Sequence, residues 1–201
     1  MKKLKIGIFG GSFNPPHLGH LNVIKMVAEN TKIKLNEIWV VPEHSHRFKS
    51  ISTNYSYILQ MCHLSFPINE EINGIAIRIF DNDQYKKTNG SMFKLLQLLK
   101  KEFHNAEFYI IVGSDIIFEL SKWHNYKKLI KEEHFIFVER TRTDWLNYNF
   151  GGFEDKFFKK NDFIFLDNPS GINISSTEIR NNIHSLNPDV IRFIYENNLY
   201  R

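Results

Sequence analysis

The chain has 201 residues, of which 42% are hydrophobic and 24% charged, a composition that excludes a disordered protein and supplies one sizeable core. Lys and Arg outnumber Asp and Glu by 26 to 22, a surplus too small and too evenly spread to indicate nucleic-acid binding, although it suits an anionic small molecule. The single cysteine, Cys62, excludes an internal disulfide, and no apolar window approaches the roughly 18 residues of a membrane span. We expect a reducing compartment, the cytoplasm, and the same argument fits the nucleus.

Short apolar runs alternate along the chain with stretches of helical spacing. The first run, 5–9, ends at Gly10, and the next stretch spaces Leu21, Ile24 and Val27 as a helix does. The run 108–112 is the most continuous and is typical of a central strand buried on both faces. The predicted strands are 5–9, 37–41, 75–80, 108–112, 134–138 and 163–166, and the predicted helices are 20–30, 55–66, 91–103, 175–183 and 188–197.

This alternation predicts an α/β protein with a Rossmann-like, doubly wound parallel sheet and helices on both faces. In such sheets ligands bind beyond the carboxyl ends of the strands, at the switch point of strand order. We expect a single domain over 1–201, with an irregular segment at about 141–162 and a small helical part at about 175–201. The irregular segment mixes aromatic and basic residues, which favours a packed insertion or a partner contact over a stacking surface for RNA.

The segment Gly10 to His20 reads Gly-Gly-Ser-Phe-Asn-Pro-Pro-His-Leu-Gly-His and follows the first predicted strand. Small residues let backbone N–H groups approach an anion, and a helix start adds positive potential. His17 and His20, three residues apart, can point the same way, as expected of a pocket for a phosphate that gains charge. Taken alone, the glycines can be an ordinary turn and the histidines a metal half-site or plain surface, and neither common phosphate-binding glycine motif is present.

A second segment, Ile174 to Arg180, places Ser175 three residues before Glu178, the pattern of a capping box that most often only starts a helix. Arg180 sits one turn further on, where a guanidinium can bind a polyphosphate beside the exposed N–H groups.

Together these two segments resemble the signatures of the nucleotidyltransferase superfamily with a His-x-Gly-His motif, and within it the nicotinate or nicotinamide mononucleotide adenylyltransferases. The resemblance implies transfer of AMP from ATP to the phosphate of nicotinate mononucleotide, or also of nicotinamide mononucleotide, giving deamido-NAD or NAD and pyrophosphate in NAD biosynthesis. It implies Mg²⁺ bound with ATP by phosphates and water, with no protein ligand to the metal. The implied ATP-binding residues are Gly10, Gly11, Ser12, Phe13, His17, His20, Gly113, Asp115, Arg140, Ser175, Thr177 and Arg180.

The resemblance makes His17, His20, Lys49 and Arg180 the catalytic residues. After the second predicted strand the sequence departs from the family pattern, so Arg47 is the alternative to Lys49 as the phosphate contact. The acceptor would meet Asn14, Thr88, Ser91 and Trp123. Trp123 would stack on the pyridine ring, although ordinary packing beside Leu120 and Tyr126 is the alternative. The stretch around Thr88 and Ser91 lacks the family's Tyr and Asp, so the acceptor side fits less closely than the ATP side.

Three alternatives remain open. Pantetheine-phosphate adenylyltransferases and small cytidylyltransferases share the first motif, and a non-catalytic nucleotide sensor would use the same sheet. We expect ATP and a pyridine mononucleotide as partners, with no nucleic acid and no membrane. A homo-oligomer is compatible with the sequence.

Overall fold

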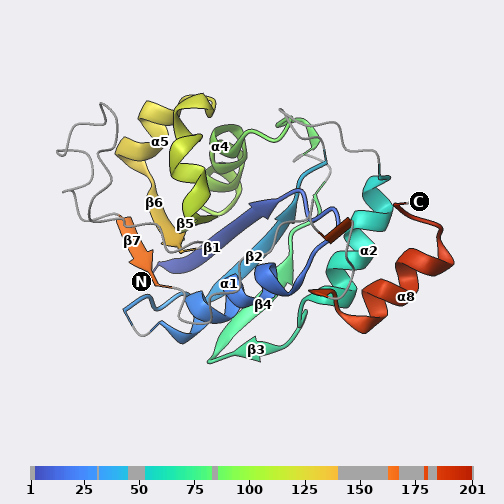
Figure 1. Ribbon diagram of the computed structural model, residues 1–201. Helices are drawn as coiled ribbons and strands as arrows, with labels where there is room; N and C mark the ends of the chain where they lie inside the picture. Colours follow the sequence, from blue (N-terminus) through green and yellow to red (C-terminus); the bar gives the residue numbers. More distant parts are fainter. Residues whose placement is uncertain are drawn as a thin grey trace.

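The computed structural model describes residues 3–30, 32–44, 53–82, 86–139, 163–167, 179–180 and 185–200 (Figure 1). Within these ranges the strands are β1 (Leu4–Gly11), β2 (Glu37–Pro42), β3 (Glu71–Ile72), β4 (Ile75–Ile79), β5 (Ala106–Gly113), β6 (His134–Val138) and β7 (Phe163–Leu166). The helices are α1 (Leu18–Glu29), α2 (Tyr55–Ser65), α4 (Met92–Glu102), α5 (Tyr126–Glu132) and α8 (Pro188–Glu196), with short 3-10 turns η1 (Ser114–Phe118) and η2 (Leu120–Lys122).

The described strands form one sheet in the order β3-β4-β2-β1-β5-β6-β7. Every neighbouring pair is parallel except β3 with β4, which is antiparallel. The chain builds outward from β1 through β2 to β4, then returns to the other side of β1 with β5. The predicted Rossmann-like class is therefore confirmed, and the strand order reverses between β1 and β5.

The register brings the ends of β1 and β5 together. Phe9 of β1 pairs with Ile111 of β5. Two residues further along each strand lie Gly11 and Gly113, the last residues of the two strands. The two turns that carry predicted ATP-binding residues, after Gly11 and after Gly113, therefore leave the sheet next to each other, at the switch point.

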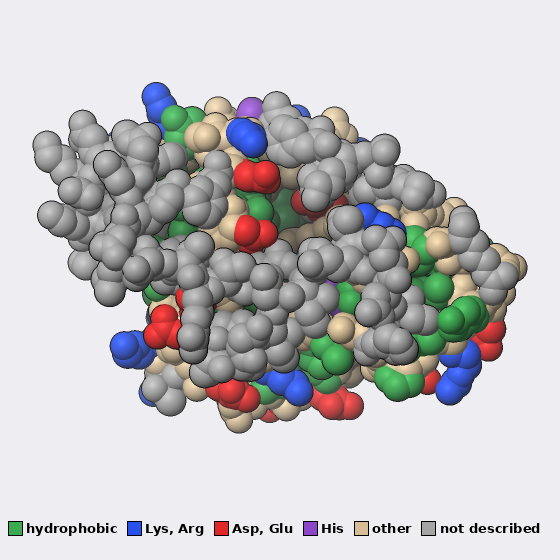
Figure 2. Space-filling model, in the orientation of Figure 1, with side chains coloured by type: hydrophobic (Ala, Val, Ile, Leu, Met, Phe, Trp, Pro, Cys, Tyr) green, Lys and Arg blue, Asp and Glu red, His purple; other side chains and the backbone are tan. Residues whose placement is uncertain are grey.

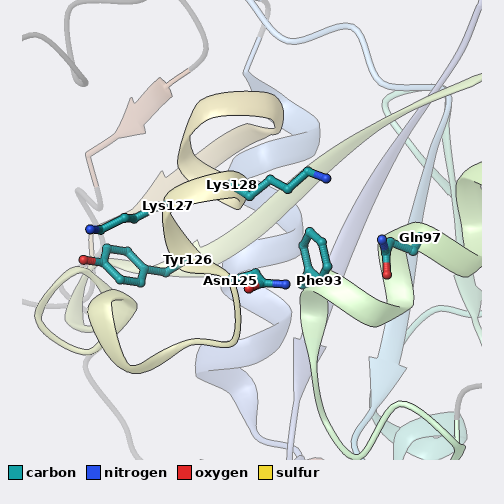
Figure 3. A pocket seen from close by; sticks show the side chains of 6 residues that line it. All are labelled: Phe93, Gln97, Asn125, Tyr126, Lys127 and Lys128. Carbon is teal, nitrogen blue, oxygen red and sulfur yellow. The ribbon is translucent and has the colours of Figure 1, made fainter.

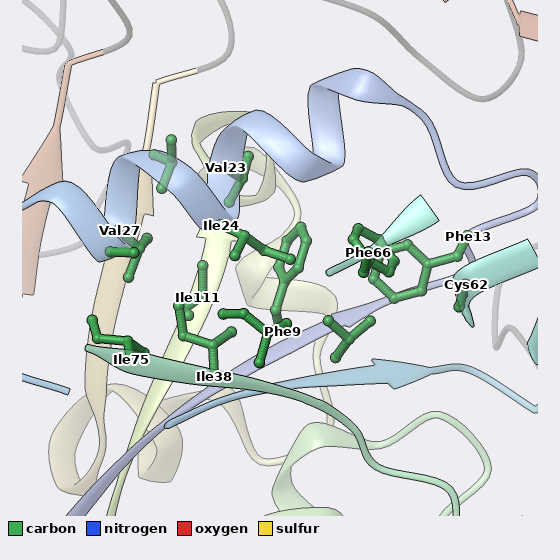
Figure 4. Close-up of a cluster of buried hydrophobic side chains, with 14 of the residues drawn as sticks. Phe9, Phe13, Val23, Ile24, Val27, Ile38, Cys62, Phe66, Ile75 and Ile111 are labelled. Carbon is green, nitrogen blue, oxygen red and sulfur yellow. The ribbon is translucent and has the colours of Figure 1, made fainter. Parts of the chain in front are cut away.

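Helices cover the two faces of the sheet separately (Figure 1). On one face α1, α2 and α8 bury a cluster that includes Phe9, Phe13, Ile24, Met61 and Val190 (Figure 4). On the other face α4 and α5 bury a cluster of their own, and successive residues of each central strand alternate between the two clusters. The central strands are therefore buried on both sides, as their continuous apolar runs predict.

Caps explain where several helices begin. The Asn54 side chain accepts from the Ser56 N–H at 3.0 Å before α2, and Asn187 accepts from Asp189 at 2.9 Å before α8. Such caps satisfy backbone donors that have no partner within the helix. The predictions did not include β3, η1, η2 or α5, all of them short elements with little periodic signal. The predicted helix 175–183 and the irregular segment 141–162 lie outside the described residues, apart from Ile179 and Arg180, which have helical backbone.

The surface mixes charges of both signs. On the face shown in Figure 2, coloured Lys and Arg side chains alternate with Asp and Glu around the edge of the molecule. Across the ranges that are described, none of the helices combines the length and the apolar character required to cross a bilayer.

Replacing Gly7 tests how tightly β1 packs at the centre of the sheet. A Cβ at Gly7 would lie 2.6 Å from Ile111 Cδ1 and 2.8 Å from Leu35 Cδ1, both in the buried core. We expect Gly7→Ala to lower the free energy of unfolding by about 1–3 kcal/mol, measured by urea denaturation. Adding Ile111→Val removes the nearer methyl group, so the double variant should lose less free energy of unfolding than the two single variants lose together. Strictly additive losses would contradict the clash.

Candidate active site

The turn after β1 is fixed by aromatic packing. Phe13 is fully buried with φ 44°, an uncommon conformation for a bulky residue. Its ring meets Phe9 edge-on at 5.5 Å and Phe66 at 5.6 Å. A Cβ on Gly11 would lie 3.1 Å from the Phe13 ring, so a glycine lets the ring close over the strand end. The turn is thus anchored in the core beneath the site.

The two histidines stand together at the start of α1. Their rings are stacked, with centroids 3.7 Å apart and an interplanar angle of 25°. The His17 backbone N–H donates to His20 Nδ1 at 3.2 Å, and the His20 ring packs edge-on against Phe13 at 4.9 Å. Because Nδ1 accepts, the neutral His20 ring carries its proton on Nε2, the form that donates to a phosphate oxygen. His20 is half-buried, whereas His17 is only 2% exposed.

Asn14 joins the first motif to the end of the chain. The Arg180 guanidinium donates to the Asn14 main-chain carbonyl at 2.8 Å. The Tyr200 hydroxyl donates to Asn14 Oδ1 and also approaches Met61 Sδ at 4.0 Å. Two segments more than 160 residues from Asn14 therefore meet at this one residue, and the structure brings the Arg180 of the second motif to the turn of the first.

At the end of β5, Gly113 precedes η1, which contains Ser114 and the exposed Asp115. This places Asp115 beyond the sheet edge beside the β1 turn. An exposed carboxylate here is suited to accept hydrogen bonds from hydroxyl groups of a ribose.

Two of the predicted acceptor residues, Thr88 and Ser91, lie where α4 begins. Ser91 is the N-cap of α4, accepts from the Lys94 N–H at 3.4 Å and lies 3.2 Å from His124 Nδ1. The next residue, Met92, reaches β1, where a Cβ on Gly10 would lie 3.2 Å from its methyl group. Thr88 is buried, and its carbonyl accepts from the Ser91 N–H at 3.1 Å. The start of α4, where Thr88 and Ser91 lie, is therefore close to the end of β1 from which the histidine turn leaves.

Trp123 ends η2 and is partly buried against the cluster beneath α4 and α5. Leu120 and Tyr126 belong to the same packing, as the alternative interpretation expects. Because Trp123 is partly exposed, its ring can also stack on a bound pyridine ring.

Sequence reasoning missed a pocket and a histidine on this side. An open cavity of about 590 Å³ lies between α4 and the start of α5, lined by Phe93, Gln97, Asn125, Tyr126, Lys127 and Lys128 (Figure 3). Phe93 also packs edge-on against His124 at 5.5 Å, so the cavity adjoins the Ser91 cap. In the sequence, the only indication that His124 lies near this site is its position directly after Trp123.

Four predicted residues lie outside the described ranges, namely Lys49, Arg140, Ser175 and Thr177, and so does the alternative Arg47.

Burial changes the chemistry of two nearby groups. Desolvation raises the pKa of the fully buried Cys62 thiol well above its usual range, so the reactive thiolate is disfavoured. Desolvation also raises the pKa of Tyr200 to about 12, against the opposing effects of a hydrogen bond with Thr53 and of the Arg180 charge. At neutral pH Tyr200 is therefore a protonated donor and Cys62 a neutral thiol.

Residues 8–182 match the cytidylyltransferase-like family. The chain is 33% identical over 184 residues to a probable nicotinate-nucleotide adenylyltransferase of Fusobacterium nucleatum, a match that covers 90% of this chain and 88% of that protein. It is 32% identical over 201 residues to another from Leptospira borgpetersenii, with 96% and 95% covered. Among solved structures it resembles the Plasmodium falciparum nicotinic acid mononucleotide adenylyltransferase complexed with NaAD, with a TM-score of 0.74 and 27% identity, covering 100% of this chain and 98% of that one.

The chain therefore belongs to the cytidylyltransferase-like family of nucleotidyltransferases. Within that class its relatives place it among the nicotinate-nucleotide adenylyltransferases, and it is an enzyme of nucleotidyl transfer. The resemblance carried by the two motifs is confirmed.

Substitutions of Ser91 test how much the cap of α4 stabilises the fold. The variant Ser91→Ala removes the cap of α4 and should lower the free energy of unfolding by about 0.5–2 kcal/mol in urea denaturation. Ser91→Thr keeps the hydroxyl and should retain most of that stability. Equal stability of the two variants would show that the cap contributes nothing.

Proposed function

We propose that the enzyme transfers the adenylyl group of ATP to the phosphate of nicotinate mononucleotide, releasing pyrophosphate and forming deamido-NAD. One observation carries the proposal: stacked imidazoles and an anchored guanidinium meet at one turn, beside the switch point of the sheet. The relatives named nicotinate-nucleotide adenylyltransferase, and the neighbour solved with NaAD, support the choice of acceptor.

The reaction is a direct displacement in which an acceptor phosphate oxygen attacks the α-phosphorus of ATP. For such a transfer the protein mainly has to position the two substrates and stabilise charge on the phosphate oxygens. His20 supplies an Nε2–H donor of fixed tautomer, and Arg180 a permanent positive charge. Because the His17 ring is 2% exposed, any phosphate that it contacts must itself be buried in the turn.

The remaining phosphate contacts are assigned by resemblance. By that resemblance Lys49 would add positive charge, Ser175 and Thr177 would hold the leaving phosphates, and Arg140 would serve the ATP side. Gly10, Gly11, Ser12 and Phe13 shape the turn, and Gly113 and Asp115 receive the nucleoside. None of these roles needs a covalent intermediate, in agreement with the neutral, buried thiol of Cys62.

Magnesium fits this site as a companion of ATP. In the described part of the chain no three His, Cys, Asp or Glu side chains gather as metal ligands. Mg²⁺ keeps much of its hydration and binds phosphate oxygens, where it would neutralise charge on the triphosphate. The chain's own residues then position the phosphates and complete the charge balance.

On the acceptor side we propose that Trp123 stacks on the pyridine ring while Asn14, Thr88 and Ser91 border the rest of the mononucleotide. The Ser91 hydroxyl is already engaged with Lys94 N–H and His124. Ser91 therefore contributes through the shape of the α4 start more than through a hydrogen bond of its own.

Pyrophosphate release tests the function. The purified enzyme is mixed with ATP and Mg²⁺ and, in separate reactions, with nicotinate mononucleotide, nicotinamide mononucleotide or pantetheine phosphate. We expect the highest kcat/KM with nicotinate mononucleotide. Release with pantetheine phosphate alone would assign the chain to a different adenylyltransferase, and no release with any acceptor would favour a nucleotide sensor.

His20→Ala should lower kcat by about a hundredfold or more, because it removes a donor aimed at charge that develops in the transition state. The matched control is His63→Ala, since His63 is an exposed histidine on α2. Steady-state kinetics at saturating ATP measures both. Near-normal turnover in His20→Ala would remove His20 from the catalytic machinery.

Trp123→Ala should raise the KM for the mononucleotide more than it lowers kcat, because stacking holds substrate and transition state alike. Trp123→Phe keeps an aromatic face and should recover part of the loss. An unchanged KM in Trp123→Ala would leave Trp123 as a packing residue only.

A further inference from the structure

A tight turn that includes Tyr200 follows the last helix, α8. Helix α8 ends at Glu196, and the Leu199 N–H donates back to the Ile194 carbonyl at 3.0 Å. Asn198 has φ 52° and Tyr200 φ 61°, both left-handed. Asparagine tolerates this conformation, whereas an aromatic residue adopts it rarely. These left-handed residues therefore turn the chain so that the Tyr200 side chain points toward Asn14.

The Tyr200 hydroxyl reaches the floor of the candidate active site. It donates to Asn14 Oδ1 and lies 4.0 Å from Met61 Sδ of α2. This part of the chain is thereby joined to the β1 turn and to α2. Packing alone would be satisfied by phenylalanine, so the polar contacts are what the hydroxyl adds.

We propose that Tyr200 is a positioning residue for adenylyl transfer, which fixes the orientation of Asn14 through its hydroxyl and thereby the anchor of Arg180. This inference rests on the proposed function of the site. It assigns to the chain end a role that neither signature motif contains.

The physical argument follows from the chemistry of the asparagine amide. An amide presents an acceptor on one side and donors on the other, and the two can exchange places by rotation. With Oδ1 held by Tyr200, the Nδ2 donors take a fixed direction. The main-chain carbonyl of the same residue accepts from Arg180 at 2.8 Å, so a hydrogen bond that holds the Asn14 side chain also restrains the backbone from which Arg180 is anchored.

The test compares Tyr200→Phe with Tyr195→Phe. Tyr195 lies on α8 and is 55% exposed, so it provides a matched loss of a hydroxyl from the same segment. In pyrophosphate release, Tyr200→Phe should lower kcat about tenfold, the effect of one lost hydrogen bond of ordinary strength, with the KM for ATP changed less than about twofold. Tyr195→Phe should match the unsubstituted enzyme. Equal kcat for the two variants overturns the inference.

A double-mutant cycle with Asn14→Ala separates positioning from stability. If Tyr200 acts through Asn14, adding Tyr200→Phe to Asn14→Ala should change kcat by less than about twofold. If the two substitutions instead lower kcat by the product of their separate effects, the inference is overturned. It is also overturned if Tyr200→Phe lowers Tm but leaves kcat normal at temperatures well below that Tm.

The side-chain amide signals of Asn14 give a readout apart from turnover. In ¹⁵N NMR, the pair that disappears in Asn14→Ala should shift in Tyr200→Phe and stay in place in Tyr195→Phe. An unshifted pair overturns the contact even if the enzyme is active. Absence of turnover in the unsubstituted enzyme instead overturns the proposed function, so the two failures are distinct.

Discussion

The hydrogen bond from Arg180 to the Asn14 carbonyl joins the last residue of the second signature segment to the first segment. These segments are 166 residues apart in the chain, and the intervening strands only bring their general regions to one edge of the sheet. Arg180 is exposed, so this bond adds little to global stability. What it supplies is a defined place for a guanidinium at the turn that leads to the two stacked imidazoles, and the proposed charge stabilisation requires such a placement.

The sheet explains why donor and acceptor can approach the same point. The β1 turn and α1 belong to the face with α2 and α8, whereas Ser91 and Trp123 belong to the face with α4 and α5. The two groups come together at the end of β1, where a Cβ on Gly10 would lie 3.2 Å from the Met92 methyl group. A triphosphate held from one face and a mononucleotide held from the other can therefore meet at the switch point. In the proposed reaction the two substrates converge there because parallel strands end at a common edge.

The sequence predicted the strands, the long helices and the site edge because each has a local signal, such as the buried run 108–112 or the string from Gly10 to His20. It did not predict β3 or α5, which have two and seven residues and little periodicity. The Tyr200–Asn14 contact was also beyond it. No local pattern reveals that a turn with left-handed Asn198 and Tyr200 returns the chain end to a turn 186 residues earlier.

The catalytic geometry is largely a consequence of core packing. The Phe13 ring, buried among Phe9 and Phe66, is also the surface on which the His20 ring rests. The His17 N–H then selects the acceptor nitrogen of that ring and leaves its proton on Nε2. A donor fixed in this way has little freedom to lose when the charge on a phosphate grows, which is the condition for preferential stabilisation of a transition state. The same hydrophobic contacts that hold α1 against the sheet therefore also prepare the imidazole for its proposed role.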